Sequence, residues 1–396
     1  MNPTIPCHME QDMGAYKRIL FDMIKRILFK VWFWQRERLF RKKRKQIART
    51  SGFHKPEKTI AAEYYQLWRP LCKSASILYP GIYAKTSGLV SSVYTPENVY
   101  YNSIELILNN KAFTSAYADK NFYEEHLPQF RDVFPNTILR GINRALYDNN
   151  YHQINDVKVL SEIIPEGIPC ILKPSIETSG GANLSIMERN GNDYLINNKS
   201  LSLSNFVSFL NNQYALSFVL QEKITQHPWF AAFNKSSVNT IRLFTYRSVK
   251  SNIIYPLHTI IRFGKEGSLV DNQAAGGLSC GIDSNGCLKY FAVDKYGKRY
   301  ENIPAIKERA GENVPALDRM KELAIKIAPK YPYHRLMGFD FCLDANNQVR
   351  LLEINCKNIE TNFLQMNNGP LFGDFTKEII DYCIQNKRSI VFDFTI

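Results

Sequence analysis

Several features that would assign this chain of 396 residues to a familiar class are missing from it. It has no uninterrupted apolar run of about 18 residues, so we expect no transmembrane helix. No apolar segment precedes a small-residue cleavage site, so we expect no secretory signal. The eight cysteines are scattered, none forms Cys-x-x-Cys, and the seven histidines form no metal-spaced cluster. We therefore expect reduced thiols in a cytoplasmic protein, without a disulfide framework or a zinc site.

Positive charge is concentrated at one end of the chain. Residues 1–50 contain 13 Lys and Arg against 4 Asp and Glu, so +9 of the formal +13 belongs to this segment. The rest of the chain is close to balanced and has no zinc finger, RNA-recognition motif or basic-aromatic stripe. This distribution predicts no nucleic-acid partner.

The basic segment itself is predicted to be a helix over residues 16–48, within a helical unit at 1–55. Leu20, Ile24 and Val31 recur at helical spacing among lysines and arginines, and residues 32–34 are Trp-Phe-Trp. Such a helix fits the anionic inner face of a membrane. It equally fits a helix whose apolar face packs on the body while its charges are solvated.

Residues 338–355 are predicted to form a β-hairpin with polar side chains on one face. Asp340 lies in the first strand, residues 346–347 form the turn, and Glu353 and Asn355 lie in the returning strand. Glu353 and Asn355 are two residues apart, so they share a face, and Asp340 can lie beside them. Oxygen ligands in this arrangement suit Mg²⁺, which usually binds together with phosphate. Taken alone, the same residues could be ordinary surface groups.

A second polar segment lies far upstream, at residues 168–187. It is predicted to be a strand ending in Lys173, a Ser- and Gly-rich loop, and a second strand. A lysine at the end of a buried strand offers a fixed charge for phosphate, and the loop Ser179-Gly180-Gly181 lets backbone N–H groups approach closely. A plain hairpin turn is the alternative. The loop is not a Walker A motif, because no Gly-x-x-x-x-Gly-Lys-Ser/Thr is present.

Taken in order, these motifs resemble those of ATP-grasp enzymes over about residues 115–385. The order is Asp-Lys at 119–120, Lys-Pro with its loop, Gln-Glu-Lys-Ile at 221–224, Asp340, and Glu-x-Asn at 353–355. The resemblance implies an α+β ATP-grasp fold, in which two subdomains clamp ATP. We accordingly expect a pre-grasp domain at 56–160 and grasp subdomains at 161–225 and 226–396.

The resemblance also implies a role for each matching residue. The ATP phosphates would be bound by Lys120 and Lys173 and covered by the loop Ser179, Gly180 and Gly181, with Glu177 as the loop acid, as in the similar D-alanine ligase branch. The adenine pocket would be lined by Gln221, Glu222, Lys223 and Ile224. Mg²⁺ would be bound by Asp340, Glu353 and Asn355.

On the substrate side, residues 238–246 are predicted to form a strand that carries Asn239 and Arg242 among apolar residues. A buried arginine needs an anion, which a transferred phosphate or an internal carboxylate could supply. Asn-Thr-Ile-Arg at 239–242, followed by a polar glycine-rich segment, is similar to the sugar-transfer-associated ATP-grasp family of surface polysaccharide and lipopolysaccharide biosynthesis. By this resemblance Arg242, Lys173 and Asn239 are the expected catalytic residues. The expected substrate-binding residues are Arg262, Asp271, Asn272, Gly276 and Gly277, and a long hairpin turn is the alternative for the glycine-rich segment.

The function that follows from the resemblance is ATP- and Mg²⁺-dependent joining of a carboxylate and an amine through an acyl phosphate, on small-molecule or glycan substrates. A phosphotransferase acting on a sugar or lipid-linked acceptor is a second hypothesis, and a nucleotide-binding scaffold for glycosyltransferases is a third. One departure concerns the acceptor. Many ATP-grasp ligases follow Glu-x-Asn with Pro-Gly, whereas this chain continues Cys356-Lys357-Asn358.

Overall fold

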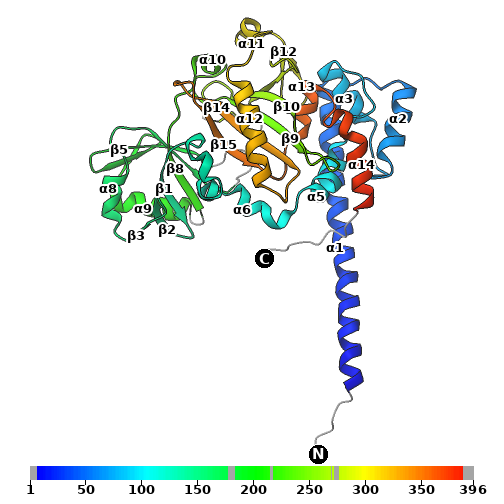
Figure 1. Ribbon diagram of the computed structural model, residues 1–396, viewed down its shortest axis with the longest axis horizontal. Coiled ribbons are helices and arrows are strands. Elements are labelled where there is room, and N and C mark those ends of the chain that lie inside the picture. The colour runs from blue at the N-terminus through cyan, green and yellow to red at the C-terminus, as the bar shows by residue number, and fades with distance from the viewer. Residues whose placement is uncertain (1–6, 177–182, 215–216, 269, 272–275, 387–396) are drawn as a thin grey trace, which may run out of the picture.

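The computed structural model describes residues 7–176, 183–214, 217–268, 270–271 and 276–386. Two antiparallel sheets with their helices form the body, and one long helix, α1, extends away from it (Figure 1). This mixture of helices and antiparallel sheets confirms the predicted α+β class. The seven cysteines whose side chains are described form no disulfide with one another.

The first sheet has eight strands in the order β3-β2-β1-β8-β4-β5-β6-β7. Its strands are β1 (Thr137–Ile142), β2 (Ala145–Asp148), β3 (Gln153–Ile154), β4 (Cys170–Pro174), β5 (Ser185–Asn190), β6 (Asp193–Ile196), β7 (Lys199–Leu201) and β8 (Ser217–Glu222). Strand β1 pairs with β8, so residues 137–154 belong to the same sheet as β4–β8. The sheet therefore crosses the domain boundary that we predicted between residues 160 and 161, because this pairing joins segments distant in the sequence.

The second sheet has seven strands in the order β13-β12-β11-β10-β9-β14-β15. Its strands are β9 (Thr240–Arg247), β10 (Ile254–Phe263), β11 (Leu278–Ile282), β12 (Leu288–Val293), β13 (Arg299–Tyr300), β14 (Leu336–Leu343) and β15 (Val349–Asn355). Strands β14 and β15 pair antiparallel, which confirms the predicted hairpin. In its turn Asn347 has a φ of 60°, a left-handed conformation that asparagine tolerates.

Helices cover both sheets. The helices are α1 (Cys7–Thr50), α2 (Lys58–Trp68), α3 (Leu78–Ser87), α4 (Glu97–Val99), α5 (Glu105–Leu108), α6 (Thr114–Ala118), α7 (Tyr123–His126), α8 (Leu160–Ile163), α9 (Leu203–Gln213), α10 (Pro228–Ala231), α11 (Pro304–Arg309), α12 (Leu317–Ile327), α13 (Thr361–Asn368) and α14 (Thr376–Gln385). A π-helical segment, η1 (Tyr100–Ile104), joins α4 to α5. Within the described ranges, no helix combines the length and the apolar composition needed to cross a membrane.

Strand alternation decides which face of each sheet is covered. In the first sheet Leu172 and Leu220 pack with Phe206 and Leu210 of α9, so the neighbouring residues of β4 and β8 face the other way. In the second sheet Leu243 and Phe339 pack with Met320 of α12. The opposite face of this sheet packs partly on α13 and α14, and its remaining part is polar. This polar part and the face of the first sheet away from α9 border the site described below.

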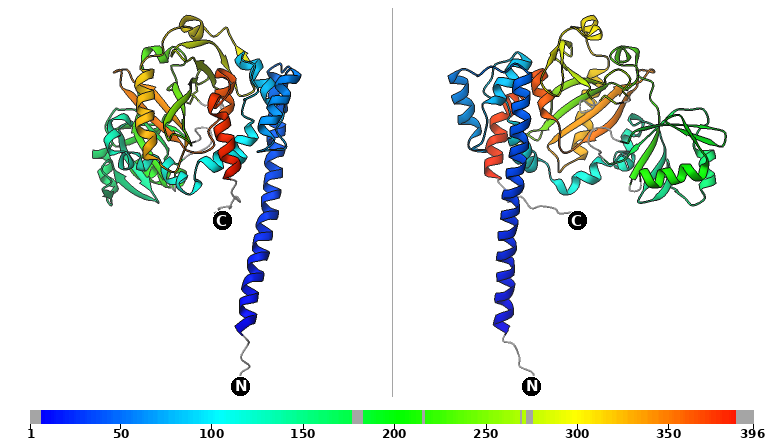
Figure 2. Two further views of the ribbon diagram at one scale, coloured as in Figure 1. Left: turned by 45° about the vertical axis from the view of Figure 1, so that its right-hand side comes forward. Right: turned by 180° about the vertical axis from the view of Figure 1, so that it is seen from behind.

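Helix α1 is longer than the predicted residues 16–48 and has two distinct halves (Figure 2). Its C-terminal half packs on the body, where Glu37, Arg44 and Ile47 are buried. Its N-terminal half extends away from the rest of the protein. Leu20, Ile24, Ile27 and Val31 are exposed there, so this apolar stripe does not pack on the body.

Candidate functional site

A cleft with a volume of about 830 Å³ lies between the two sheets. Its first wall comes from β4 and β8, through residues that include Ile171, Lys173 and Gln221. Its second wall comes from β9, β10, β14 and β15, through residues that include Thr240, Arg242, Arg262, Asp340, Glu353 and Asn355. Lys120 also lines the cleft, so residues from motifs far apart in the sequence meet in one cavity.

Charged side chains form a row across the second sheet. Register places Arg242 of β9 opposite Asp340 of β14, and Asp340 opposite Glu353 of β15. Arg242 makes a bidentate ion pair with Asp340, in which Nη2 donates to Oδ2 at 2.7 Å. Burial would raise the pKa of Asp340, but the guanidinium groups of Arg242 and Arg262 outweigh it and lower this pKa. The internal carboxylate partner that was one alternative for Arg242 is therefore the one found.

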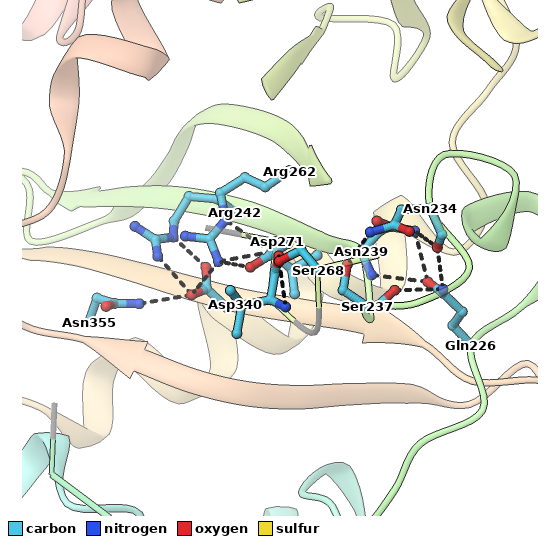
Figure 3. Close-up of polar contacts among 12 residues, drawn as sticks. Gln226, Asn234, Ser237, Asn239, Arg242, Arg262, Ser268, Asp271, Asp340 and Asn355 are labelled. Carbon is cyan, nitrogen blue, oxygen red and sulfur yellow. Dashed lines mark hydrogen bonds and ion pairs between the residues drawn. The ribbon is translucent and has the colours of Figure 1, made fainter. Parts of the chain in front are cut away.

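The row continues into a second buried pair. Nη2 of Arg262 lies 3.2 Å from both carboxylate oxygens of Asp271 and 3.4 Å from Oδ2 of Asp340. The Thr240 hydroxyl also donates to Asp271. Nδ2 of Asn355 donates to Asp340 at 3.4 Å. Figure 3 shows Arg242, Arg262 and Asn355 converging on Asp340, with Asp271 nearby, in a network that fixes their orientation before any ligand arrives.

Two lysines face this row. Nζ of Lys120 donates to Oε1 of Glu353 at 2.7 Å. Burial would raise the pKa of Glu353, but the ammonium of Lys120 outweighs it and lowers this pKa. The side chain of Lys173 makes no hydrogen bond or ion pair with any residue that the structure describes. Burial together with the charge of Lys120 lowers the pKa of its ammonium to about 8. A desolvated ammonium without a carboxylate partner is suited to bind an incoming anion.

The predicted adenine residues lie at the end of β8 and border the cleft. Nε2 of Gln221 donates to the Thr137 hydroxyl at 3.0 Å, and Oε1 of Glu222 accepts from Nδ2 of Asn136 at 2.9 Å. Their side chains are thus held by β1 and the residue before it. The backbone N–H of Lys223 donates to Pro169. No described residue accepts a hydrogen bond from the N–H of Ile224, which leaves this donor for a ligand or water.

Asn239 does not line the described part of the cleft, so its expected catalytic role stays a prediction that this placement does not support. Its side chain is fully buried and its Nδ2 donates to the carbonyl oxygens of Phe230 at 2.7 Å and Asn234 at 2.8 Å (Figure 3). Alternation along the strand explains this, because residues three apart point to opposite faces. Asn239 holds the segment before β9 in place, whereas Arg242 faces the cleft.

Of the remaining predicted site residues, some line the cleft, some do not, and some lie outside the described residues. Arg262 and Asp271 line the cleft. Gly276 and Gly277 precede β11, and neither borders the described part of the cavity. Glu177, Ser179, Gly180, Gly181 and Asn272 lie outside the described residues.

The cleft also contains residues that sequence reasoning missed. Thr240 could have been found, because it is two residues from Arg242 and shares its face. Further examples are Arg36, Phe40 and Lys43 of α1, Glu97, Tyr101, and Lys357, Asn358 and Glu360 after β15. The α1 residues are spaced as one helical face, but only tertiary packing shows what that face meets.

The predicted Mg²⁺ ligands offer a limited donor set. The described residues contain no cluster of three or more His, Cys, Asp or Glu side chains that could hold a metal. Asp340, Glu353 and Asn355 do lie together, and Mg²⁺ commonly uses one or two carboxylates plus phosphate oxygens and water. The set therefore fits Mg²⁺ bound together with a phosphorylated ligand. Both carboxylates contact protein cations here, so these would have to yield to the metal.

The two antiparallel sheets and the polar cleft between them agree with an ATP-grasp fold, and comparison of the sequence with family profiles identifies the family. The profile described as "Sugar-transfer associated ATP-grasp" matches residues 96–379, well over half of the chain. The chain therefore belongs to the sugar-transfer associated ATP-grasp family, as its motifs suggested. A search of curated proteins gives no match.

Solved structures with a similar fold are distant in sequence. They include N5-carboxyaminoimidazole synthetase from Staphylococcus aureus complexed with ADP, at 11% identity over 62% of this chain and 46% of that one, with a TM-score of 0.35. The ATP-grasp ligase PsnB, complexed with a minimal precursor, matches at 15% identity over 71% and 63%, with a TM-score of 0.36. Biotin carboxylase from Campylobacter jejuni matches at 13% identity over 71% and 48%, with a TM-score of 0.40. The chain spans about half to two thirds of the length of these proteins.

Proposed function

We propose that the protein is an ATP-dependent ligase that joins a carboxylate to an amine in surface polysaccharide assembly. The observation that carries this proposal is Lys173, whose ammonium has no carboxylate partner among the residues that the structure describes and which faces the Arg242–Asp340–Glu353 row across one cleft. A cation held in this way suits the phosphates of a nucleotide. The family match supports the same assignment and adds the link with sugar transfer.

In the proposed reaction the carboxylate oxygen attacks the terminal phosphorus of ATP and ADP leaves. The product of this step is an acyl phosphate. The amine then attacks the acyl carbon, phosphate leaves with the bonding electrons, and the nitrogen loses a proton to give an amide. The products are ADP, phosphate and the amide, so atoms and charge balance.

The chain's own residues have separable tasks in this scheme. Lys173 would bind terminal phosphate oxygens, and Ile224 would offer its free N–H to the base. Arg242 would stabilise negative charge as it develops, because a guanidinium matches phosphate geometry. Asp340, Glu353 and Asn355 would hold Mg²⁺, which supplies neutralisation of phosphate charge when it is bound.

The identity of the phosphorus product tests the proposal against a phosphotransferase. The protein would be incubated with Mg²⁺, ATP and mixtures of sugar acids, amino acids and amino sugars, and the products would be followed by mass spectrometry. Phosphate released together with ADP, and a product that has lost one water, support the ligase. Phosphate retained on the acceptor would show a kinase, and tight ATP binding without turnover over the whole panel would show a scaffold.

We also propose that the N-terminal half of α1 contacts an anionic membrane surface. Its exposed stripe contains Leu20, Met23, Ile24, Ile27, Leu28 and Val31. The same half carries basic residues at 17, 18, 25, 26 and 30. An apolar stripe beside basic side chains complements the interface of a membrane with acidic lipids. This would hold the cleft close to substrates assembled at the membrane.

A further inference from the structure

The cleft extends past the predicted nucleotide and metal residues to helix α1. That end is lined by Arg36, Phe40 and Lys43 of α1, Glu97 of α4, Tyr101 of η1, and Lys357, Asn358 and Glu360 after β15. The α1 residues follow i, i+4, i+7 spacing, so one helical face supplies all three. The segment after β15 begins directly beyond Glu353 and Asn355, so this end of the cleft adjoins the predicted reaction centre.

This part of α1 is fixed to the body. Oε1 of Glu37 accepts hydrogen bonds from Nδ2 of Asn98 at 2.9 Å and Nδ2 of Asn102 at 3.1 Å. Arg44 and Ile47 are also buried. The face that carries Arg36, Phe40 and Lys43 adjoins these anchored residues on the helix, so it is held in place as a wall of the cleft.

Two contacts join this wall to the segment after β15. The ring of Phe40 stacks on Tyr101, with centroids 5.8 Å apart and an angle of 11° between the planes. The Tyr101 hydroxyl in turn donates to the carbonyl oxygen of Ile359 at 3.0 Å. Nζ of Lys43 donates to Glu97 at 2.6 Å, so its charge already has a carboxylate partner. The result is an ordered aromatic surface with one satisfied ion pair.

Arg36 differs from Lys43 in having no such partner. Its guanidinium carbon lies 4.5 Å from the centroid of Trp32 and 5.6 Å from that of Phe40. The guanidinium of Arg36 makes no hydrogen bond or ion pair with any residue that the structure describes. Burial lowers the pKa of Arg36, whereas nearby Glu105, Tyr101 and Glu37 act to raise it, although none of them bonds to its guanidinium. A stacked guanidinium whose donors are not used by any described residue is well placed to receive an anion through paired hydrogen bonds.

We propose that this end of the cleft is the acceptor subsite, and that its ligand carries an oxyanion next to an apolar ring face. Arg36 binds the oxyanion, which is a carboxylate or a phosphate. The Phe40–Tyr101 stack contacts the ring. The inference rests on the proposed function, because it assigns a substrate class to the same cleft.

Binding to the full chain tests the subsite without any turnover. The protein would be saturated with Mg²⁺ and a non-hydrolysable ATP analogue and titrated by calorimetry. The probes are D-glucuronate with neutral D-glucose, and N-acetylglucosamine 1-phosphate with neutral N-acetylglucosamine. We expect one anionic probe to bind at least tenfold more tightly than its neutral counterpart, and the pair that shows the difference identifies the oxyanion. Equal binding within both pairs, or no binding, overturns the proposal.

Charge variants place the effect on one residue. R36Q should weaken binding of the anionic probe at least tenfold. R36M should weaken it equally while keeping an apolar contact with Trp32. R36K keeps a positive charge and should retain part of the affinity. The control is R38Q, an exposed arginine of the same helix that does not line this cleft, which should bind as wild type does. Unchanged binding in both R36Q and R36M, or equal losses in R38Q, overturns the proposal. ATP-analogue affinity should be unchanged in R36Q, and failure of ADP formation with every acceptor would refute the ligase without affecting these measurements.

Discussion

At the scale of single residues, the cleft pairs most of its inward-facing charges before a ligand binds. Arg242 holds Asp340, Arg262 holds Asp271, and Lys120 holds Glu353. Removing one partner of such a buried pair leaves an uncompensated charge, which is more costly than the pair is favourable. Lys173 is different because burial lowers the pKa of its ammonium and no carboxylate of the described residues contacts it. Binding of an anion beside the Lys173 ammonium therefore offsets the free-energy cost of removing this charge from water.

The first prediction concerns the pH dependence of nucleotide binding. The pKa of Lys173 is lowered to about 8, so its ammonium is present below pH 8 and is lost as the pH rises through this value. Affinity for an ATP analogue should therefore fall above pH 8 by up to about tenfold per pH unit, since only the protonated form attracts phosphate. K173M should bind about 10–100-fold more weakly at pH 7 and lose this pH dependence, because a charged hydrogen bond contributes about 1.5–3 kcal/mol. Calorimetric titrations between pH 6.5 and 9.5 measure both effects.

The control for this experiment is K199M, which removes an exposed lysine from β7 of the same sheet. Its affinity and pH profile should match the wild type. K173M should also unfold at the wild-type temperature or above it, because the substitution removes a desolvated charge. A pH profile that stays in K173M would exclude Lys173 as the titrating group.

The second prediction concerns the metal. E353Q keeps the shape of the side chain but removes the charge that binds Lys120 and would bind Mg²⁺. We expect Mg²⁺-dependent nucleotide binding to weaken by about tenfold or more and turnover to be abolished, with an unchanged circular dichroism spectrum. Mg²⁺ alone should bind weakly to the wild type, because protein cations already contact both carboxylates. Wild-type Mg²⁺-nucleotide affinity in E353Q would rule out Glu353 as a metal ligand.

The site residues show what a sequence can predict at this scale. Asp340, Glu353 and Asn355 share a face because strand alternation and a two-residue spacing require it. The same rule argues against placing Asn239 and Arg242 together, since three residues separate them. The carboxylate partner of Arg242 was not predictable, because it depends on register between β9 and β14, which lie far apart in the chain.

At the scale of elements, the segment after β15 is held from behind by α5. Oε1 of Glu105 accepts a hydrogen bond from the backbone N–H of Ile359 at 3.2 Å. Burial raises the pKa of Glu105 to about 7, although the bonds from residues 358 and 359 and the charge of Lys111 act to lower it. A carboxyl group that titrates near neutrality thus supports the segment in which the acceptor subsite is proposed.

The third prediction follows from the sign of this shift. A carboxyl whose pKa is about 7 when folded and near 4.5 when unfolded stabilises the fold below pH 4.5, and this contribution is lost as the pH rises to 7. Glutamine does not ionise, so E105Q does not lose this stabilisation as the pH rises. Its free energy of unfolding, relative to that of the wild type, should therefore increase between pH 5 and pH 8. The difference is at most on the order of 3 kcal/mol, from about 1.36 kcal/mol per pKa unit. Urea unfolding at the two pH values measures it.

The matched control is E63Q, since Glu63 is exposed on α2. Its stability difference from the wild type should not change with pH. A difference for E105Q that also stays constant from pH 5 to pH 8 would contradict the assignment of a raised pKa to Glu105.

Elements were predictable from the sequence where their signals are local. The hairpin, the strand ending in Lys173, and α1 all follow from spacing and turn residues. The extent of the first sheet was not predictable, because β1 joins β8 through pairing that no local pattern encodes. The same limit hid the role of α1 as a wall of the cleft, since Glu37 reaches Asn98 and Asn102 across the fold.

At the scale of the whole molecule, α1 connects two surfaces with different chemistry. Its packed half lines the cleft, whereas its N-terminal half extends from the body with an exposed apolar stripe (Figure 2). Trp34, on the side of the helix away from the cleft, is 62% exposed. A rigid helix between the two would fix the distance and the orientation of the cleft relative to any surface that the stripe binds.

The fourth prediction is that this half of α1 binds vesicles containing acidic lipid. Full-length protein should sediment with vesicles of phosphatidylglycerol and phosphatidylcholine at low salt, but not with phosphatidylcholine alone, and should be released by high salt. Each Lys or Arg near an anionic surface contributes about 1 kcal/mol, and the charge attraction is screened within about 10 Å at 0.1 M salt. Deleting residues 1–30 removes five lysines and arginines and most of the stripe, but keeps the packed residues from Glu37 onward. The truncated protein should stay in the supernatant.

The truncation is informative because it separates the membrane contact from the site. Binding of an ATP analogue and of the anionic acceptor probe should be the same with and without residues 1–30, since Arg36 and Phe40 remain in place. I27D in the full chain tests the apolar stripe without a deletion, because a buried carboxylate opposes insertion into the interface. Its sedimentation should fall while its net charge stays strongly positive. Unchanged sedimentation of the truncated protein would refute the membrane contact. If the truncated protein stays in the supernatant but I27D sediments as the wild type does, the contact is charge attraction without insertion of the apolar stripe.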